Sequence, residues 1–253
     1  MSDKVFTVLR QVLAYAIDHD MGIDVNPAMT SKFTTHHTSS ESHPFIKKWD
    51  DVPNFFYQYF DLDVTNTNVY VKALGQMMIF TGFRMGALSM AEWSHIDFNK
   101  KELVIPWQNN RKCVYFKLKR DFYIPLVEPV MELIQNMHKL SGNSEFIFPS
   151  LNDHTKKLDP SQVNTSMKKI DKYKDQISGH GWRHFFTTHG QDVFKLDGDL
   201  IHFSTGHPPG GKVRSTYDSA RHMDRRREMY RIWCDGLCDI GLDPSFPFKG
   251  LPI

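Results

Sequence analysis

Residues 178–184 read Ser-Gly-His-Gly-Trp-Arg-His. Taken together with two other short motifs in the chain, this stretch indicates the fold. Ser178-Gly179 permits a turn, and the residues that follow open a helix with His180 and Arg183 near its start. By itself the motif is a weak signal, because a lone histidine is more often a satisfied polar group than a catalyst.

Two further motifs lie on either side of this stretch. Residues 81–88 read Thr-Gly-Phe-Arg-Met-Gly-Ala-Leu, where an apolar helix ends, a glycine permits a turn and Arg84 precedes a new helix. Residues 205–207 read Thr-Gly-His, and Tyr217 follows ten positions after His207 inside a strongly basic segment. Each motif alone is weak, since an arginine after a glycine turn is often a surface cap, but together they form an ordered set.

In this order and spacing the motifs resemble the tyrosine recombinase (phage integrase) family. Its catalytic domain carries an arginine in a TGxR turn, a lysine on a β-hairpin, an HxxR motif, a GH motif and a nucleophilic tyrosine. Lys117 matches the hairpin lysine because it lies eight residues before Pro125-Leu126. The resemblance covers about residues 45–237, and the ending is similar to the prophage and genomic-island subgroup. It implies six catalytic residues, with the last as nucleophile: Arg84, Lys117, His180, Arg183, His207 and Tyr217.

The implied reaction requires these residue types. Two guanidiniums hold the nonbridging oxygens of a phosphodiester bidentately and stay charged at any working pH. The two histidines add N–H donors, and one of them takes the phenol proton. Tyr217 needs neighbouring cations because an ordinary phenol, with a pKa of about 10, is a poor nucleophile. Lys117 is the expected general acid for the leaving 5′ oxygen. No metal or nucleotide cofactor is expected, since a 3′-phosphotyrosine stores the bond energy.

One position departs from the family pattern. The family usually has Glu or Asp three residues after the first arginine, and this chain has Ala87. In the family that acid supports the architecture of the site and does not perform the chemistry. Ala87 therefore bears on how Arg84 is positioned and leaves the reaction class unchanged.

Hydrophobic spacing predicts a mainly α chain with a small antiparallel β-sheet (α+β). The resemblance implies that this is the tyrosine recombinase catalytic-domain fold. The expected strands are residues 102–106, 112–119 and 120–125. The expected helices are residues 5–18, 51–60, 66–82, 86–93, 126–140, 160–174, 181–195, 197–204 and 213–236.

The domain boundaries follow from the same spacing, and the identity of each domain is what the resemblance implies. We expect residues 1–28 to be the last helix of a truncated core-binding domain, residues 29–46 to be a polar linker, and residues 47–253 to be the integrase catalytic domain with a C-terminal tail. A single helix cannot bury its own apolar face. It should therefore expose a patch that folds back or pairs with another chain, formed by Leu9, Val12, Leu13 and Ala16.

Composition excludes several classes of protein. The 253 residues are 40% hydrophobic and 24% charged, which is typical of a globular chain with a real core. No apolar run reaches the length of a membrane span, and the first residues lack a secretory cleavage site. The three cysteines have no metal-ligand spacing, which fits a reducing compartment. We expect a cytoplasmic protein of bacterial or phage origin, associated with the nucleoid.

The net charge of +2 is too small to indicate nucleic-acid binding by itself. Basic residues nevertheless cluster between residues 112 and 120 and between residues 221 and 231. With the resemblance, the expected partners are double-stranded DNA attachment sites and a homotetramer on synapsed DNA, with an excision factor as an optional further partner. The expected DNA contacts outside the catalytic set are Lys112, Lys119, Arg120, Arg214, Arg221 and Arg225.

Three alternatives stay open at this stage. Ala87 is compatible with a catalytically silent DNA-binding regulator on the same fold. His180 and His184 have the spacing of two zinc ligands in a metallohydrolase, although Gly181 stands where such an enzyme has its general-base glutamate. Type IB topoisomerases resemble the same active site, but the integrase-like tail favours recombination. Tyr230 competes with Tyr217 for the nucleophile, and its helical spacing indicates packing.

Overall fold

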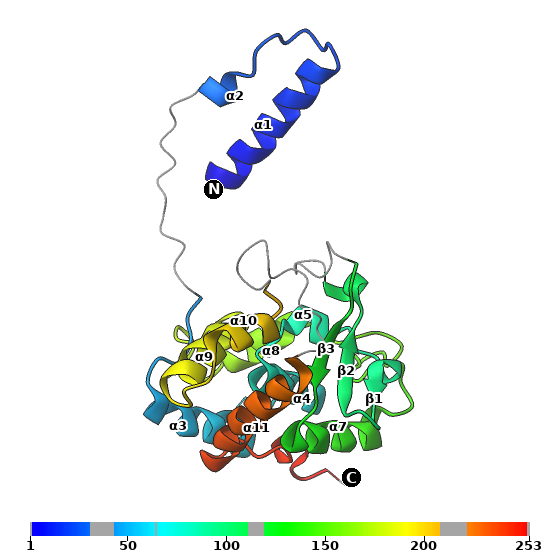
Figure 1. Ribbon diagram of the computed structural model, residues 1–253, viewed down its shortest axis with the longest axis vertical. Coiled ribbons are helices and arrows are strands. Elements are labelled where there is room, and N and C mark those ends of the chain that lie inside the picture. The colour runs from blue at the N-terminus through cyan, green and yellow to red at the C-terminus, as the bar shows by residue number, and fades with distance from the viewer. Residues whose placement is uncertain (1, 31–42, 64, 111–118, 208–221, 252–253) are drawn as a thin grey trace. The chain divides into compact units, whose positions relative to one another are not determined.

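The computed structural model describes residues 2–30, 43–63, 65–110, 119–207 and 222–251 (Figure 1). The chain forms two compact units, which we call the N-terminal unit (residues 1–42) and the main unit (residues 43–253). In the part of the chain that the structure describes, no helix is long and apolar enough to cross a membrane.

The N-terminal unit pairs helix α1 (Ser2–Asp18) with the short helix α2 (Pro27–Thr30). Arg10 Nε donates a hydrogen bond to the carbonyl oxygen of Ala28 at 3.0 Å, which holds the second helix against the first. The exposure expected for α1 is confirmed for Leu9 and Val12, which are 43% and 58% exposed. It is wrong for Ala16, which is buried because the chain folds back along α1.

Helix α4 (Val69–Thr81) is the centre of the main unit. Every residue from Tyr70 to Thr81 is buried, as expected for a helix that is apolar nearly all round. Four helices pack against it (Figure 1): α7 (Glu128–Ser141), α8 (Ser161–Met167), α9 (Gly181–Asp192) and α11 (Met223–Asp239).

Shorter helices complete the main unit. Helix α3 (Val52–Phe56) continues into a wider turn at Tyr57–Asp61, and α5 (Met85–Leu88) and α10 (Gly198–Ser204) are each one or two turns long. Single 3₁₀ turns lie at Trp49–Asp51, Trp93–His95, Trp107–Asn110 and Phe246–Phe248.

The sheet has three described antiparallel strands in the order β1 (Ile96–Asp97), β2 (Glu102–Ile105) and β3 (Phe122–Pro125). Leu103 pairs with Ile124, and Ile105 pairs with Phe122, so the buried side chains of two strands share one face. The expected strands 102–106 and 120–125 are confirmed to within two residues. The expected strand 112–119 lies outside the described residues except for Lys119.

Two helices are shorter than the hydrophobic spacing predicts. The helix expected at 86–93 ends at Leu88, because residues 91–93 form hydrogen bonds with residues 145–147 instead of continuing the helix. The helix expected at 160–174 ends at Met167. The buried Met167, Ile170 and Tyr173 continue at intervals of three, and tight turns with bonds between residues i and i+3 satisfy this spacing without an α-helix.

Candidate active site

The site begins at the turn that ends α4. Gly82 has a φ of 59°, in the left-handed region, and its N–H bonds to the Met78 carbonyl at 2.9 Å. A Cβ atom on Gly82 would lie 2.3 Å from Cδ1 of Phe186, so space as well as conformation requires glycine. The chain leaves this turn with Arg84 at the N-terminus of α5.

Arg84 is half-buried and carries an unsatisfied donor. Its Nη1 atom is buried and has no hydrogen-bond partner among the residues that the structure describes. Leaving a buried charged donor unpaired is costly, about 1–3 kcal/mol or more. An anionic ligand would remove that cost, so Arg84 is poised to bind one.

Arg183, in the first turn of α9, connects the three motifs. Its guanidinium is buried and donates from Nη1 to the Gly82 carbonyl at 3.3 Å and from Nη2 to the Thr205 carbonyl at 2.6 Å. Gly82 belongs to the turn before Arg84, and Thr205 lies two residues before His207. One side chain therefore fixes the distance between the two flanking motifs.

His207 follows helix α10, and the Thr205 hydroxyl orients its ring. The hydroxyl donates to the His202 carbonyl at 3.0 Å, so its single proton is used. Its contact of 3.1 Å with His207 Nδ1 must then be one in which Nδ1–H donates and the hydroxyl accepts. In a neutral ring this leaves Nε2 without a proton, as a base requires.

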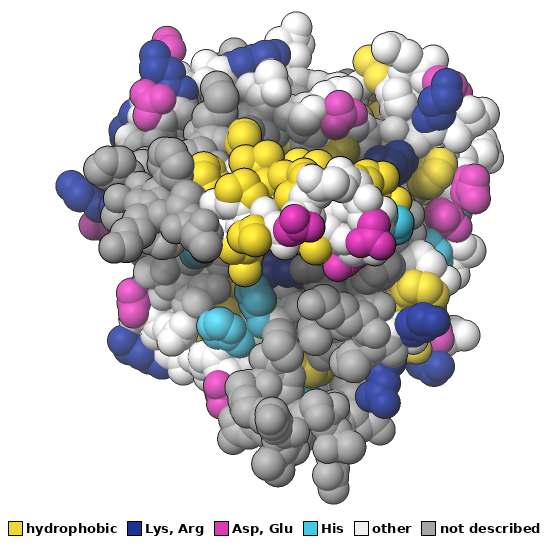
Figure 2. Space-filling model, turned by 90° about the horizontal axis from the view of Figure 1, so that it is seen from above, with side chains coloured by type: hydrophobic (Ala, Val, Ile, Leu, Met, Phe, Trp, Pro, Cys, Tyr) yellow, Lys and Arg dark blue, Asp and Glu magenta, His cyan; other side chains and the backbone are white. Residues whose placement is uncertain are grey.

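The electrostatics show that the arginines and histidines form one cluster. Partial burial, followed by the charge of Arg183, lowers the pKa of His180 to about 4, and Arg84 adds to the effect. Partial burial lowers the pKa of His207 to about 4 as well, and the next causes are the charges of Arg183 and Arg84. Both residues remain partly exposed, and Figure 2 shows histidine side chains gathered on one face. Both rings are neutral at pH 7.

Two buried side chains of helix α11 bond to residues shortly before Arg84 and His207 in the sequence. Tyr230 is buried and donates from its hydroxyl to the Thr81 carbonyl at 3.0 Å, and burial raises its pKa. Its interpretation as a packing residue is confirmed. Arg226 is fully buried, lies over the rings of Phe122 and Phe203 at 4.8 and 5.2 Å, and donates from Nε to the Ser204 hydroxyl at 3.1 Å.

The remaining predicted site residues divide into two groups. Lys119 and Arg120 are exposed just before β3, and Arg225 is exposed and forms an ion pair of 2.9 Å with Asp197. The others lie outside the described residues and stay predictions: Lys112, Lys117, Arg214, Tyr217 and Arg221.

A histidine that the sequence assigned to the linker lies beside the site. The ring centroid of His43 is 4.4 Å from that of His180 and 6.3 Å from that of His184, and the latter two rings are 5.7 Å apart. Within the described ranges, no three His, Cys, Asp or Glu side chains are arranged to hold one metal ion. His43 carries no periodic or motif signal in the sequence. Thr205 begins the Thr-Gly-His motif, but nothing in that motif predicts its hydrogen bond to His207.

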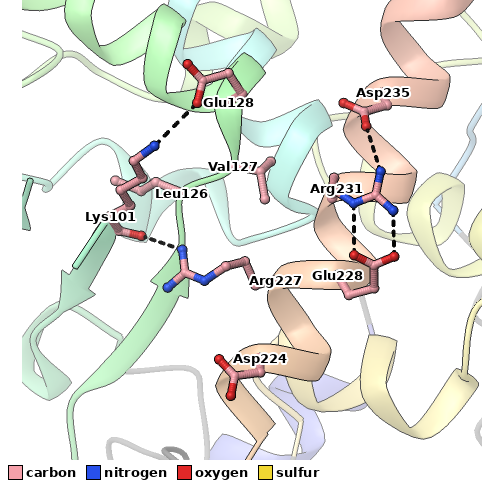
Figure 3. A pocket seen from close by; sticks show the side chains of 9 residues that line it. All are labelled: Lys101, Leu126, Val127, Glu128, Asp224, Arg227, Glu228, Arg231 and Asp235. Carbon is pink, nitrogen blue, oxygen red and sulfur yellow. Dashed lines mark hydrogen bonds and ion pairs between the residues drawn. The ribbon is translucent and has the colours of Figure 1, made fainter. Parts of the chain in front are cut away.

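A separate pocket of about 450 Å³ lies between α11 and the end of the antiparallel β2–β3 pair at which β2 begins and β3 ends (Figure 3). Its charged groups are largely paired with one another, for example Arg231 with Glu228 at 2.6 Å and Lys101 with Glu128 at 3.4 Å. None of the four catalytic candidates that the structure describes, Arg84, His180, Arg183 and His207, lines it. The lining residues are Lys101, Leu126, Val127, Glu128, Asp224, Arg227, Glu228, Arg231 and Asp235.

Comparison with known proteins identifies the class to which this fold and site belong. A family model described as the phage integrase family matches residues 57–190, more than half of the chain. The chain belongs to the phage integrase family, the tyrosine recombinases. The integrase of Shigella phage Sf6 is 29% identical over 163 residues, which is 64% of this chain and 40% of that protein. The chain spans 40% to 58% of the length of the curated relatives it matches.

Two crystal structures share the fold. A lambda integrase dimer bound to a COC′ core site has a TM-score of 0.59 and 17% identity, and the match covers 80% of this chain and 70% of that one. A lambda integrase tetramer bound to a Holliday junction has a TM-score of 0.59 and 15% identity, covering 85% of this chain and 59% of that one.

Proposed function

We propose that this chain is the catalytic part of a site-specific DNA recombinase that cleaves and rejoins DNA through a 3′-phosphotyrosine intermediate. The observation that carries the proposal is the buried Nη1 of Arg84, which has no partner among the described residues and lies in one cluster with Arg183 and two neutral histidines. Such a cluster fits the nonbridging oxygens of a phosphodiester, which gain charge as the phosphorus is attacked.

The proposed step is a transesterification. The Tyr217 oxygen attacks phosphorus and gives up its proton to Nε2 of His207, while the bond from phosphorus to the 5′ oxygen breaks. Lys117 supplies the proton for that oxygen, and Arg84 and Arg183 stabilise the charge on the phosphate. Religation is the reverse of this step, so the energy of the broken bond is retained in the phosphotyrosine.

The partners follow from the same proposal. The lambda integrases of this fold are described on a core site as a dimer and on a Holliday junction as a tetramer. We infer that this chain also acts on double-stranded attachment sites as a tetramer, with Lys112, Lys119, Arg120, Arg214, Arg221 and Arg225 as DNA contacts. An excision factor, a core-binding role for residues 1–28 and association with the nucleoid belong to the same proposal.

The test is to trap a covalent protein–DNA adduct on a nicked suicide duplex and to map the attached residue. Tyr217→Phe should bind the duplex as the unaltered chain does and form no adduct, because only the nucleophilic oxygen is removed. Tyr57→Phe is the matched control, since Tyr57 is 50% exposed on the helical segment after α3. Duplex binding without adduct formation by the unaltered chain would instead support a DNA-binding regulator.

A further inference from the structure

The first residues of the main unit, His43–Ile46, form a strap across the N-terminus of α9. The Pro44 carbonyl accepts hydrogen bonds from the backbone N–H of Ser178 at 3.0 Å and from its hydroxyl at 3.2 Å. The Ile46 carbonyl accepts a hydrogen bond of 2.9 Å from Nε2 of His189, which lies near the C-terminal end of α9, and Ile46 itself is buried. The strap is therefore anchored before and after the residue pair His180 and Arg183.

The strap explains the glycine inside the histidine–arginine motif. A Cβ atom on Gly181 would lie 1.9 Å from the Pro44 oxygen and 2.8 Å from its carbonyl carbon. Backbone atoms cannot move aside as a flexible side chain can, so any larger residue at this position would displace the strap. The motif thus contains a residue whose purpose is to let another segment approach the catalytic helix.

The strap also places a ring against the catalytic histidine. The His43 ring meets the His180 ring nearly edge to face, with centroids 4.4 Å apart and planes at 65°. The ring centroid of Phe45, two residues further along the strap, lies 6.3 Å from that of His184, with the planes at 24°. Rings packed against each other in this way restrict each other's rotation.

We propose that the strap is a positioning element for the recombinase reaction, in which His43 holds the imidazole of His180 in its orientation toward the two arginines. His43 does not touch the reacting atoms and acts only through His180. The proposal rests on the proposed function for the role of His180, but the contact itself does not.

The experiment compares His43→Ala and His43→Phe with the unaltered chain in two measurements. The first records the ¹H–¹³C NMR signals of the His180 ring without DNA, and the second records the single-turnover cleavage rate and the affinity for a suicide duplex. His43→Ala should shift the His180 signals and slow cleavage about 10- to 100-fold with unchanged affinity, the effect of a small misplacement. Phenylalanine keeps an aromatic edge and should restore most of the rate.

His154→Ala is the matched control, because His154 is also an exposed histidine in an edge-to-face contact, with Tyr70 at the opposite end of α4 from Gly82. It should change neither measurement. Unchanged His180 signals, an unchanged rate, or failure of phenylalanine to restore the rate would each overturn the proposal. If the unaltered chain cleaves no DNA, the proposed function fails, and the NMR signals alone still decide whether His43 orients His180.

Discussion

Arg183 and Thr205 are joined by a hydrogen bond of 2.6 Å from the guanidinium Nη2 to the backbone carbonyl. The residue expected to bind phosphate is thus also a structural cross-link, because its Nη1 atom donates to the Gly82 carbonyl as well. The buried guanidinium of Arg183 therefore bonds both to the turn that precedes Arg84 and to the turn that precedes His207. Positioning and charge are supplied by the same side chain.

Arg183→Lys should therefore reduce both stability and activity. A lysine ammonium cannot reach two carbonyls in the fork geometry of a guanidinium, so at least one buried carbonyl loses its charged donor. We expect the free energy of unfolding in urea to fall by about 1.5–3 kcal/mol, the range for a lost hydrogen bond to a charged group. Cleavage of a suicide duplex should fall more than stability explains. Equal stability of the two chains would contradict the cross-link.

Alanine substitutions at two glycines of the same motif, Gly82 and Gly86, should have different effects on stability. Gly82→Ala should destabilise the chain by about 2 kcal/mol or more, because the left-handed φ disfavours a side chain and Phe186 occupies the space. Gly86→Ala is the matched control, since a Cβ atom there would meet nothing within 4 Å. Alanine in α5 should leave stability unchanged or raise it by up to about 1 kcal/mol. Urea unfolding of both variants checks this, and similar losses would argue against the packing at Gly82.

Stability should fall as the pH is lowered from about 6.5 toward 4. In the folded chain the pKa of both His180 and His207 is about 4, whereas an unperturbed histidine has a pKa of 6.5. Between these values the unfolded chain binds more protons, so acidification favours unfolding. Urea unfolding at pH 7 and pH 5 should show this loss. A variant with asparagine at both positions should lose less, and an identical loss would contradict the assignment.

Lys117→Ala should slow cleavage of ordinary DNA by about 10²- to 10⁴-fold, the range for losing a general acid. A duplex with sulfur at the 5′ bridging position has a much better leaving group and does not need that acid. The variant should cleave this duplex nearly as fast as the unaltered chain does. Without such rescue, Lys117 would be a phosphate contact at most, and Lys119 would become the residue to test.

Excess EDTA should change the adduct yield by no more than a few-fold, because no step of the proposed reaction uses a divalent ion. The measurement is adduct formation on the suicide duplex with and without the chelator. Complete loss that zinc restores would instead favour metal binding at His180 and His184.

Most of the fold could be predicted from the sequence, because α4 is a long apolar segment and the apolar spacing of α7 and α9 fits helices with one buried face. The errors occur where partners distant in the sequence determine the local structure. Residues 91–93 leave the helical pattern to pair with residues 145–147, and no local signal in the sequence reports that pairing.

The candidate active site was likewise predictable only in part. Arg84, His180, Arg183 and His207 could be predicted because their side chains carry the chemistry. The bonds that place them could not, since they are made to the backbone carbonyls of Gly82 and Thr205, which have no side-chain signature. His43 lies in a polar, non-periodic segment, so only the structure reveals its contact with His180.

The burial of Arg226 against Phe122 and Phe203 also bears on how strongly DNA binding should depend on salt concentration. A cation that is enclosed in the folded chain displaces no condensed counterion when DNA binds. Arg227 is similarly engaged, with the carbonyls of Lys100 and Lys101 at 3.1 and 3.3 Å. Each arginine withdrawn in this way reduces the slope of log affinity against log salt concentration by about 0.9. If the chain binds DNA as proposed, its affinity will therefore depend less steeply on ionic strength than a count of the arginines in α11 suggests.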